Sequence, residues 1–221
     1  TLYRLTSYAS GGDAVTSASQ QTVLPRAALG EAESQPDMVL VCGPAKLPGG
    51  IPDDLAAWLR RLAASGVVLG GIGGGTEALA RLGLLDGYQA TLPWQRFEAF
   101  AAAHPRVRLS QQLFEIDRDR ITCGGGTAAM DMMITLVESH HGPGLATRIS
   151  EYFVMERIRM GDEPQQIPLR SRLAHAPDSL VEAVQLMEAN IEEPLSTHEL
   201  AEHLGFSRRQ LERLFNKYLS S

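Results

Sequence analysis

Residues 66–94 read GVVLGGIGGGTEALARLGLLDGYQATLPW and decide the fold of the larger part of the chain. The continuous apolar run at 67–70 predicts a buried strand. The glycines at 70–75 predict a tight turn, and TEALARL at 76–82 predicts a helix directly after it. A strand that turns at once into a helix is typical of α/β proteins.

The segment upstream continues this alternation. DMVLVC at 37–42 predicts a strand buried on both faces of a sheet, and DDLAAWLRRLAA at 53–64 predicts a helix with Asp53 or Asp54 as its N-cap. Strand, helix, strand and helix in this order predict an open α/β sheet that is mainly parallel, with helices on both faces.

Downstream, residues 95–103 predict a helix, and 113–116 with 121–123 predict a strand pair around a polar turn. A long helix is expected at 127–140. Another is expected after the Gly-Pro-Gly at 142–144, with Leu145, Ile149, Tyr152 and Phe153 on one face.

The pattern changes at 161–177, which holds three prolines and no periodicity and therefore predicts a linker. Three helices are expected after it, at 178–190, 196–204 and 207–219. The domains predicted are therefore an α/β domain at 1–160, a linker at 161–177 and a helical segment at 178–221.

The 221 residues carry a net charge of -6, which over the whole chain does not favour a nucleic-acid partner, so charge has to be considered locally. No apolar run reaches the roughly 20 residues of a membrane-spanning helix, and no signal peptide is visible. The two cysteines have no metal-ligand spacing. We therefore expect a cytoplasmic protein without a membrane partner, a cofactor or a metal.

The second and third of the C-terminal helices have the boundaries of a helix-turn-helix. Ser196 and Glu199 have capping-box spacing, Gly205 is a helix stop, and Ser207 caps the next helix. The residues expected to pack the two helices together are Leu200, Ala201, Leu204, Leu211, Leu214 and Phe215.

The outer face of the last helix would then carry the side chains that bind DNA. They are Ser207, Arg208, Arg209, Glu212, Arg213 and Asn216. Arginine pairs bidentately with guanine and asparagine with adenine, and Ser207 at the helix N-terminus can meet phosphate. Residues 196–221 hold four basic and three acidic side chains, a net charge of +1. An ordinary helical hairpin with a solvated basic face is the alternative.

The stretch LSTHELAEHLGFSRRQLERLF at 195–215 resembles the first helix-turn-helix of the AraC family of transcription regulators. The resemblance implies that double-stranded DNA at promoter half-sites is a partner, with RNA polymerase as a further partner. A homodimer is expected because paired half-sites raise affinity and specificity. Members of that family carry two such motifs, whereas this chain stops at Ser221, so we expect that the second motif is missing.

The stretch 66–94 resembles the PfpI-type, class I glutamine amidotransferase-like superfamily. It is most similar to the branch fused to AraC-type domains that responds to arginine, glycine betaine or carnitine. The resemblance implies a flavodoxin-like fold whose first strand would precede Thr1 and is missing. Enzymes of the superfamily carry a nucleophilic cysteine at the turn and a histidine nearby, where this chain has Gly73 and Pro93. We therefore expect a sensor domain and no enzyme.

A small-molecule effector is expected at this turn. Backbone N–H groups at the N-terminus of the helix can bind a carboxylate, and an aromatic ring can face a cation. The residues expected to bind it are Gly43, Gly73, Gly74, Gly75, Thr76 and Trp94. Carboxylate and cation together suggest a zwitterion, an amino acid or a betaine. The predicted function is a ligand-responsive transcription regulator, an activator of an amino-acid or quaternary-amine catabolic operon.

Three alternatives stay open. The first is a PfpI-type hydrolase or amidase with an appended helical module, whose nucleophile would have to be Cys42 or Cys123. The second is a nucleotide-binding turn, since Gly73, Gly75 and Ala78 fit G-x-G-x-x-A, although a lone match of this kind is a weak signal. The third is a scaffold that binds neither ligand nor DNA.

Overall fold

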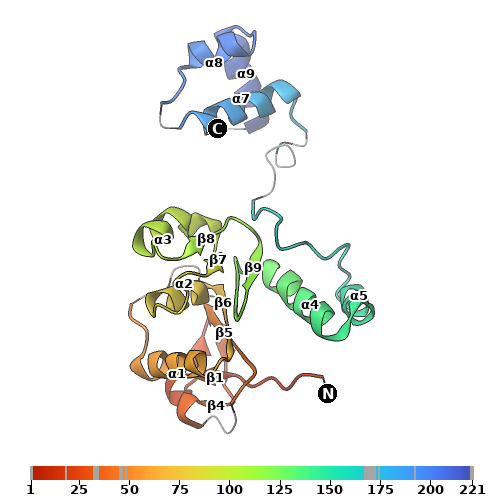
Figure 1. Ribbon diagram of the computed structural model, residues 1–221. Coiled ribbons are helices and arrows are strands. Elements are labelled where there is room, and N and C mark those ends of the chain that lie inside the picture. Colours follow the sequence, from red (N-terminus) through yellow and green to blue (C-terminus); the bar gives the residue numbers. More distant parts are fainter. Residues whose placement is uncertain are drawn as a thin grey trace. The chain divides into compact units, whose positions relative to one another are not determined.

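The computed structural model describes residues 2–17, 19–31, 35–44, 47, 49–166, 173, 175–191 and 193–219. The chain divides into two compact units, Thr1–Gln165 and Gln166–Ser221 (Figure 1). Each unit is described by itself.

The larger unit is built on a four-stranded sheet. Its strands are β5 (Met38–Gly43), β6 (Val68–Gly73), β9 (Phe114–Asp117) and β10 (Arg120–Cys123), in the order β5-β6-β10-β9. β6 pairs in parallel with β5 and β10, and β9 pairs antiparallel with β10. The prediction of an open, mainly parallel sheet is confirmed.

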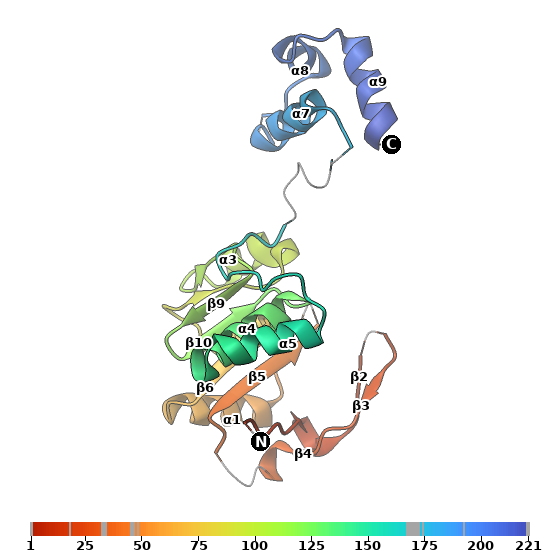
Figure 2. The same ribbon diagram turned by 90° about the vertical axis from the view of Figure 1, so that its right-hand side faces the viewer.

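Helices cover both faces of this sheet. On one face, α1 (Asp53–Ala64), α2 (Gly74–Arg81) and α3 (Phe97–Ala103) bury a core that includes Leu59, Leu79 and Phe100. On the other, α4 (Ala128–His141) packs Met132 and Leu136 against strand residues. α5 (Pro143–Tyr152) lies beside α4, and Figure 2 shows both in front of the sheet.

Several short elements complete the unit and were not predicted. They are β1 (Tyr8–Ala9), η1 (Ser10–Gly12), β2 (Val15–Thr16), β3 (Thr22–Val23), β4 (Ala27–Ala28), η2 (Leu29–Glu31), β7 (Gln89–Ala90), η3 (Trp94–Arg96) and β8 (Arg108–Leu109). β1 pairs with β4, β2 with β3 and β7 with β8. Two-residue strands are too short to produce a recognisable period in the sequence.

Three details of the first strands and helices differ from the expectations. β5 is an edge strand of the described sheet and is half-buried rather than buried on both faces. The N-cap of α1 is Pro52, and Asp54 in its first turn accepts hydrogen bonds from Ser10 Oγ at 2.6 Å and from the Leu55 N–H at 2.8 Å. β6 continues to Gly73, so the expected glycine turn is reduced to a single residue.

The buried face of α5 also differs from the expectation. Ala146 and Ser150 are buried, whereas Tyr152 is 84% exposed and Phe153 is 55% exposed. α5 packs on α4 through its small residues, which allow the helices to approach closely, and its aromatic residues remain in solvent.

The segment that follows α5 is held against the larger unit as far as Gln165. The Leu113 N–H donates to the carbonyls of Gly161 (3.0 Å) and Glu163 (2.9 Å), and Pro164 bridges to Gln112. The sequence predicted linker here, and residues 161–165 instead belong to the α/β unit. Of the rest of the expected linker, 167–172 and 174 lie outside the described residues.

The smaller unit holds α7 (Asp178–Ala189), α8 (Thr197–His203) and α9 (Arg208–Leu219). Each lies within two residues of the boundaries that the sequence predicted. Their apolar faces share one core, in which Ala183, Leu200, Ala201 and Leu211 are buried.

Candidate functional site

The turn between α8 and α9 is fixed by local hydrogen bonds. Ser196 and Glu199 form a complete capping box at the start of α8, with the Ser196 N–H donating to Glu199 Oε2 at 2.8 Å. Gly205 has φ +70°, a conformation that glycine adopts without strain, and ends α8. Ser207 and Gln210 form the same reciprocal pair at the start of α9, with the Ser207 N–H donating to Gln210 Oε1 at 2.8 Å.

The core of the helix-turn-helix is largely the one expected. Ala201 is 2% exposed and Leu211 is 1% exposed, so the small side chain lies where the helices come together. Leu204 and Phe215 pack against them, together with Phe206 from the turn. Leu214 is half-buried and is not part of this cluster among the described residues.

The residues expected to read DNA share one exposed surface. Arg208, Arg209, Glu212, Arg213 and Asn216 of α9 are all exposed, as is Ser207 before it. Arg208 Nε donates to Glu212 Oε1 at 2.9 Å, a pair one helical turn apart. Arg209 and Arg213 have no ion pair with any residue that the structure describes, so their guanidinium groups are available to bases or phosphates.

The second candidate site, the turn from β6 into α2, is tightly closed. Gly73 has φ +60° and ψ −122°, which places it at a sharp elbow between strand and helix. A Cβ atom on Gly74 would lie 1.9 Å from the Pro44 carbonyl oxygen, and one on Gly75 would lie 1.7 Å from the Val41 carbonyl oxygen. The end of β5 therefore lies directly on the start of α2.

Burial limits what this elbow can bind. Gly73, Gly74, Gly75 and Thr76 are all buried, and Thr76 Oγ1 donates to the Gly71 carbonyl at 3.2 Å. Gly43, opposite Gly73 in the register of the sheet, is half-buried. The residues whose N–H groups were expected to meet a carboxylate are thus buried, with the end of β5 packed against Gly74 and Gly75.

Neither thiol has the environment of a nucleophile. Cys42 and Cys123 both lie opposite Ile72 on its two neighbouring strands. Burial raises the pKa of the Cys123 thiol, and burial likewise raises the pKa of the Cys42 thiol. Both therefore stay protonated at neutral pH, whereas a nucleophilic cysteine needs a lowered pKa.

A group that the sequence did not reveal lies next to the elbow. The side-chain amide of Gln165 is inserted among the backbone carbonyls of Leu92 and Gln112 and the hydroxyl of Thr91. Trp94, expected to face the effector, is 44% exposed and donates its backbone N–H to Gln165 Oε1 at 3.0 Å. Gln165 was missed because it falls in a stretch without periodicity, and its partners lie 53 to 74 residues away in the chain.

The glycines after β10 connect this group with the elbow. A Cβ atom on Gly124 would lie 2.7 Å from Gln165 Oε1, and one on Gly125 would lie 3.6 Å from the Gly73 Cα. The Gln165 amide and the elbow are therefore neighbouring parts of one region at the carboxyl ends of the strands, where open α/β sheets bind ligands.

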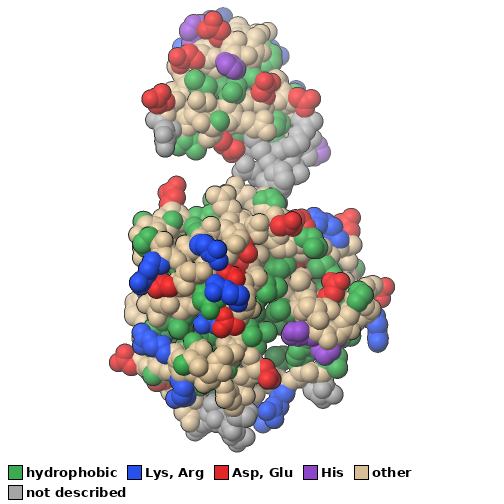
Figure 3. Space-filling model, viewed as in Figure 1, with side chains coloured by type: hydrophobic (Ala, Val, Ile, Leu, Met, Phe, Trp, Pro, Cys, Tyr) green, Lys and Arg blue, Asp and Glu red, His purple; other side chains and the backbone are tan. Residues whose placement is uncertain are grey.

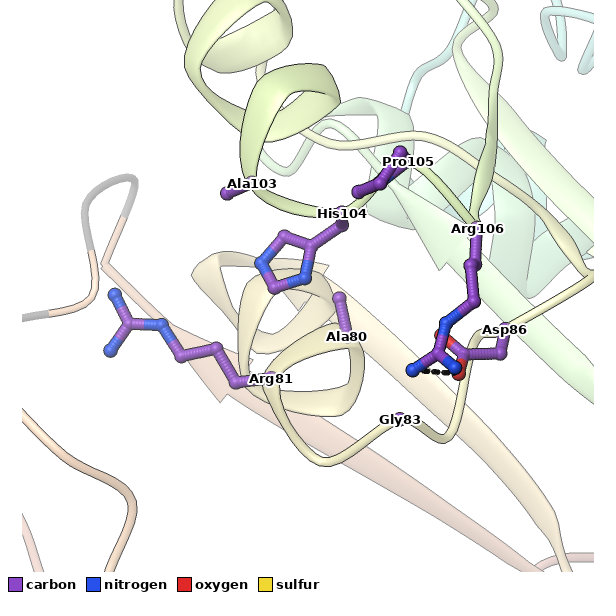
Figure 4. Close-up of a pocket in the computed structure, with 8 residues that line it drawn as sticks. All are labelled: Ala80, Arg81, Gly83, Asp86, Ala103, His104, Pro105 and Arg106. Carbon is purple, nitrogen blue, oxygen red and sulfur yellow. Dashed lines mark ion pairs between the residues drawn. The ribbon is translucent and has the colours of Figure 1, made fainter.

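A cavity of about 430 Å³ lies elsewhere, between α2 and the end of α3 (Figure 4). Arg106 forms an ion pair with Asp86 at 2.9 Å, and Figure 4 shows Arg81 extending away from this pair. Arg81 is bound instead to Glu77 and to the carbonyls of Leu47 and Gly49. Burial lowers the pKa of His104, which favours its neutral form. The cavity thus has little free charge to select a ligand.

The charge and metal-ligand distributions do not add a further site. On the face of the larger unit shown in Figure 3, Lys and Arg side chains lie interspersed with Asp and Glu side chains, which gives a surface of mixed sign. Within the described ranges, no group of three or more His, Cys, Asp or Glu side chains could hold a metal ion. No helix in the described part of the chain is long and apolar enough to cross a membrane.

Comparison with curated proteins gives relatives of one kind, although no family model matches. The chain is 47% identical over 173 residues to the HTH-type transcriptional regulator ArgR of Pseudomonas aeruginosa, covering 78% of this chain and 53% of that protein. It is 33% identical over 223 residues to the HTH-type transcriptional regulator GlxA of Rhizobium meliloti, covering 98% of this chain and 67% of that protein. The chain spans about half the length of ArgR.

Solved structures give a consistent result. An AraC family transcriptional regulator from Pseudomonas putida matches with a TM-score of 0.57 and 29% identity, covering 64% of this chain and 76% of that one. A ThiJ/PfpI family protein from Pseudomonas syringae matches with a TM-score of 0.60 and 21% identity, covering 82% and 74%. The second likeness shows the flavodoxin-like fold of the larger unit.

Proposed function

The chain belongs to the AraC family of HTH-type transcriptional regulators, and we propose on this premise that it is a ligand-responsive regulator whose helix α9 reads promoter DNA. The observation that carries the proposal is the surface of α9. Five polar side chains, three of them arginines, are exposed on a helix whose opposite face is anchored by Leu211 at 1% exposure. A helix fixed on one face and rich in arginine on the other can enter the major groove.

The proposed roles follow from the contacts of each side chain. Arg209 and Arg213, which have no ion pair among the described residues, are the proposed readers of guanine, and Asn216 that of adenine. Arg208 is held by Glu212 and is proposed to contact a phosphate once that pair opens. Ser207 at the N-terminus of α9 is the proposed partner of a second phosphate.

The larger unit is the proposed sensor of a small-molecule effector. Its relatives are named transcriptional regulators, its elbow carries no side chain at Gly73, and the pKa values of both thiols are raised. These observations support a protein that does not catalyse a reaction. Of the residues expected to bind the effector, Trp94 has an exposed side chain, whereas the glycines at 43 and 73–75 form the backbone scaffold beside it.

The remaining parts of the proposal concern the whole protein. We propose a cytoplasmic homodimer that binds paired half-sites, because two recognition units raise both affinity and specificity. Its proposed role is activation of an amino-acid or quaternary-amine catabolic operon, with RNA polymerase as a further partner.

The test is recovery of genomic DNA fragments by the full-length protein at near-physiological salt, followed by binding measurements on the recovered site. The expected result is a sharp enrichment upstream of an operon. Arg213→Ala should weaken specific binding by about 1–3 kcal/mol, while Arg60→Ala on the exposed side of α1 should leave it unchanged.

Two outcomes would contradict the proposal. Uniform recovery of all fragments would show that binding is electrostatic and without sequence preference. Equal affinities of Arg213→Ala and Arg60→Ala for the recovered site would exclude α9 as the reading helix.

A further inference from the structure

The Gln165 side chain occupies a cradle of hydrogen-bonding groups at the carboxyl ends of β7 and β10. Its Nε2 lies 2.8 Å from Thr91 Oγ1, 2.9 Å from the Leu92 carbonyl oxygen and 2.9 Å from the Gln112 carbonyl oxygen. Its Oε1 accepts the Trp94 N–H at 3.0 Å. One side chain thus fills a site with three acceptors for a nitrogen and one donor for an oxygen.

The cradle is held in place by bonds that do not involve Gln165. The Thr91 N–H donates to Thr122 Oγ1 at 2.9 Å, and Thr91 Oγ1 donates to the Gln112 carbonyl at 2.9 Å. Thr91, Leu92 and Thr122 have no exposed surface. Because Thr91 is hydrogen-bonded on both sides and Thr91 and Leu92 are buried, we expect this part of the cradle to keep its shape if Gln165 leaves.

The acceptors of the cradle outnumber the donors that Gln165 brings. An amide NH₂ group has two hydrogens, whereas three oxygens lie within 2.9 Å of Nε2. A primary ammonium group has three hydrogens and would satisfy all three oxygens. A quaternary ammonium group has none, so the Leu92 carbonyl would lose its partner and the Gln112 carbonyl would keep only the Thr91 hydroxyl, which is unfavourable for the fully buried Leu92.

Gln165 is also the last residue of the α/β unit, so its position bears on the chain that leads to the helical unit. The segment before it has a separate anchor, since Arg159 donates through its backbone N–H (3.0 Å) and its side chain to Asp131, which has no exposed surface. Withdrawal of Gln165 would therefore free the end of the segment and leave Arg159 in place.

We propose that the Gln165 amide is an internal occupant of an effector subsite, and that a primary ammonium group with an adjoining oxygen acceptor, as in an amino acid or its amide, displaces it. The ammonium takes the three acceptors and the oxygen takes the Trp94 N–H. Displacement removes the Gln165 anchor of residues 161–165, and the remaining bonds of Leu113 to Gly161 and Glu163 then open more often. Only the consequence for DNA binding rests on the proposed function.

The first experiment measures amide hydrogen exchange at two positions of the whole chain. The Trp94 N–H reports the bond to Gln165, and the Leu113 N–H, bound to Gly161 and Glu163, reports the docked segment. Gln165→Ala should speed exchange at both by about tenfold, the effect of losing a hydrogen bond and its neighbours. Gln165→Glu should do so at least as strongly, because it places a carboxylate oxygen against three acceptors.

Gln166→Ala is the matched control, since this neighbouring glutamine is exposed and lies in the other unit. It should exchange like the unaltered protein at both amides. If Gln165→Ala also leaves both rates unchanged, Gln165 does not hold the segment and the proposal is wrong.

The second experiment tests the ligand class on the Gln165→Ala protein, whose cradle is empty. Glycinamide, with its ammonium and carbonyl oxygen, should slow Trp94 exchange at millimolar concentration, and its N-trimethyl counterpart should not. Equal protection by both compounds, or by neither, would overturn the ammonium assignment. Neither exchange experiment uses DNA. If the genomic experiment shows that the protein is not a regulator, the exchange results remain valid, so the two proposals can fail independently.

Discussion

The N-termini of α2 and α9 look alike in sequence and differ in what they can bind. Both helices follow a glycine-containing turn, and each was expected to offer N–H groups to an anion. In the structure the first residues of α2, Gly74 to Thr76, are buried beneath the backbone of β5, whereas Ser207 and Arg208 at the start of α9 are exposed. The start of α9 therefore presents side chains to solvent, whereas the start of α2 is packed against another strand of the sheet.

The largest expected effect concerns the closed terminus. Gly75→Ala would place a methyl group 1.7 Å from the Val41 carbonyl oxygen, a backbone atom that cannot move without shifting β5. We expect the free energy of unfolding of the α/β unit to fall by about 3 kcal/mol or more, measured by denaturant unfolding.

Gly144→Ala is the control for this change. Gly144 lies in α5, and a Cβ atom there would have nothing within 4 Å. Because alanine restricts the unfolded chain more than glycine does, this variant should gain about 0.4–1 kcal/mol. If the two alanine variants unfold at the same denaturant concentration, β5 does not close the start of α2, and the contrast between the helix termini fails.

The elements that set this contrast could be predicted from sequence to different degrees. α1, α4, α7 and α9 carry about three to four turns of periodic apolar residues, and the short α8 has a capping box and a glycine stop, so their existence and approximate bounds follow from local pattern. The elbow at Gly73 followed from the glycines and from the resemblance to the amidotransferase-like superfamily. The covering of the elbow could not be predicted, because it depends on the backbone carbonyls of Val41 and Pro44, about 30 residues earlier in the chain. A contact between backbone atoms does not change the pattern of side chains in the sequence.

The Gln165 cradle could not be predicted for a related reason. Its acceptors are mostly main-chain carbonyls, which every residue has, and its occupant comes from a proline-containing stretch that has the composition of a linker. By contrast, the exposed face of α9 could be predicted, since the polar positions of an amphipathic helix follow directly once its apolar face is known.

A smaller effect is expected at the open terminus. Ser207→Ala removes the hydroxyl that accepts the Gln210 N–H at the start of α9. Loss of an N-cap of this kind costs about 1 kcal/mol, so the amides of α9 should exchange roughly fivefold faster. Thr197→Ala, at an exposed position in the first turn of α8 that is not the cap, should leave exchange in α9 unchanged. Equal exchange in both variants would show that Ser207 is not what fixes this helix start.

The smallest effect separates the two capping boxes of the helical unit by pH. The box of α8 uses Glu199, whose pKa is lowered by hydrogen bonds from the Ser196 side chain and backbone, whereas the box of α9 uses Gln210, which does not titrate. A carboxyl whose pKa is lowered in the folded state stabilises that state above its ordinary pKa, and the contribution is lost as the pH falls through the lowered value.

Acidification from about pH 6 to about pH 3 should therefore loosen the start of α8 in the unaltered protein and less so in Glu199→Gln, which keeps an acceptor for the Ser196 N–H without the charge. Amide exchange of Leu200, compared between the two proteins at each pH, isolates this difference from the intrinsic pH dependence of exchange. Exchange in the first turn of α9 should be the same in both proteins throughout. If protection of the Leu200 amide falls equally in both proteins, carboxylates other than Glu199 control the acid sensitivity of α8. If only α9 changes with pH, the capping box that titrates is the one of α9 and not the one of α8.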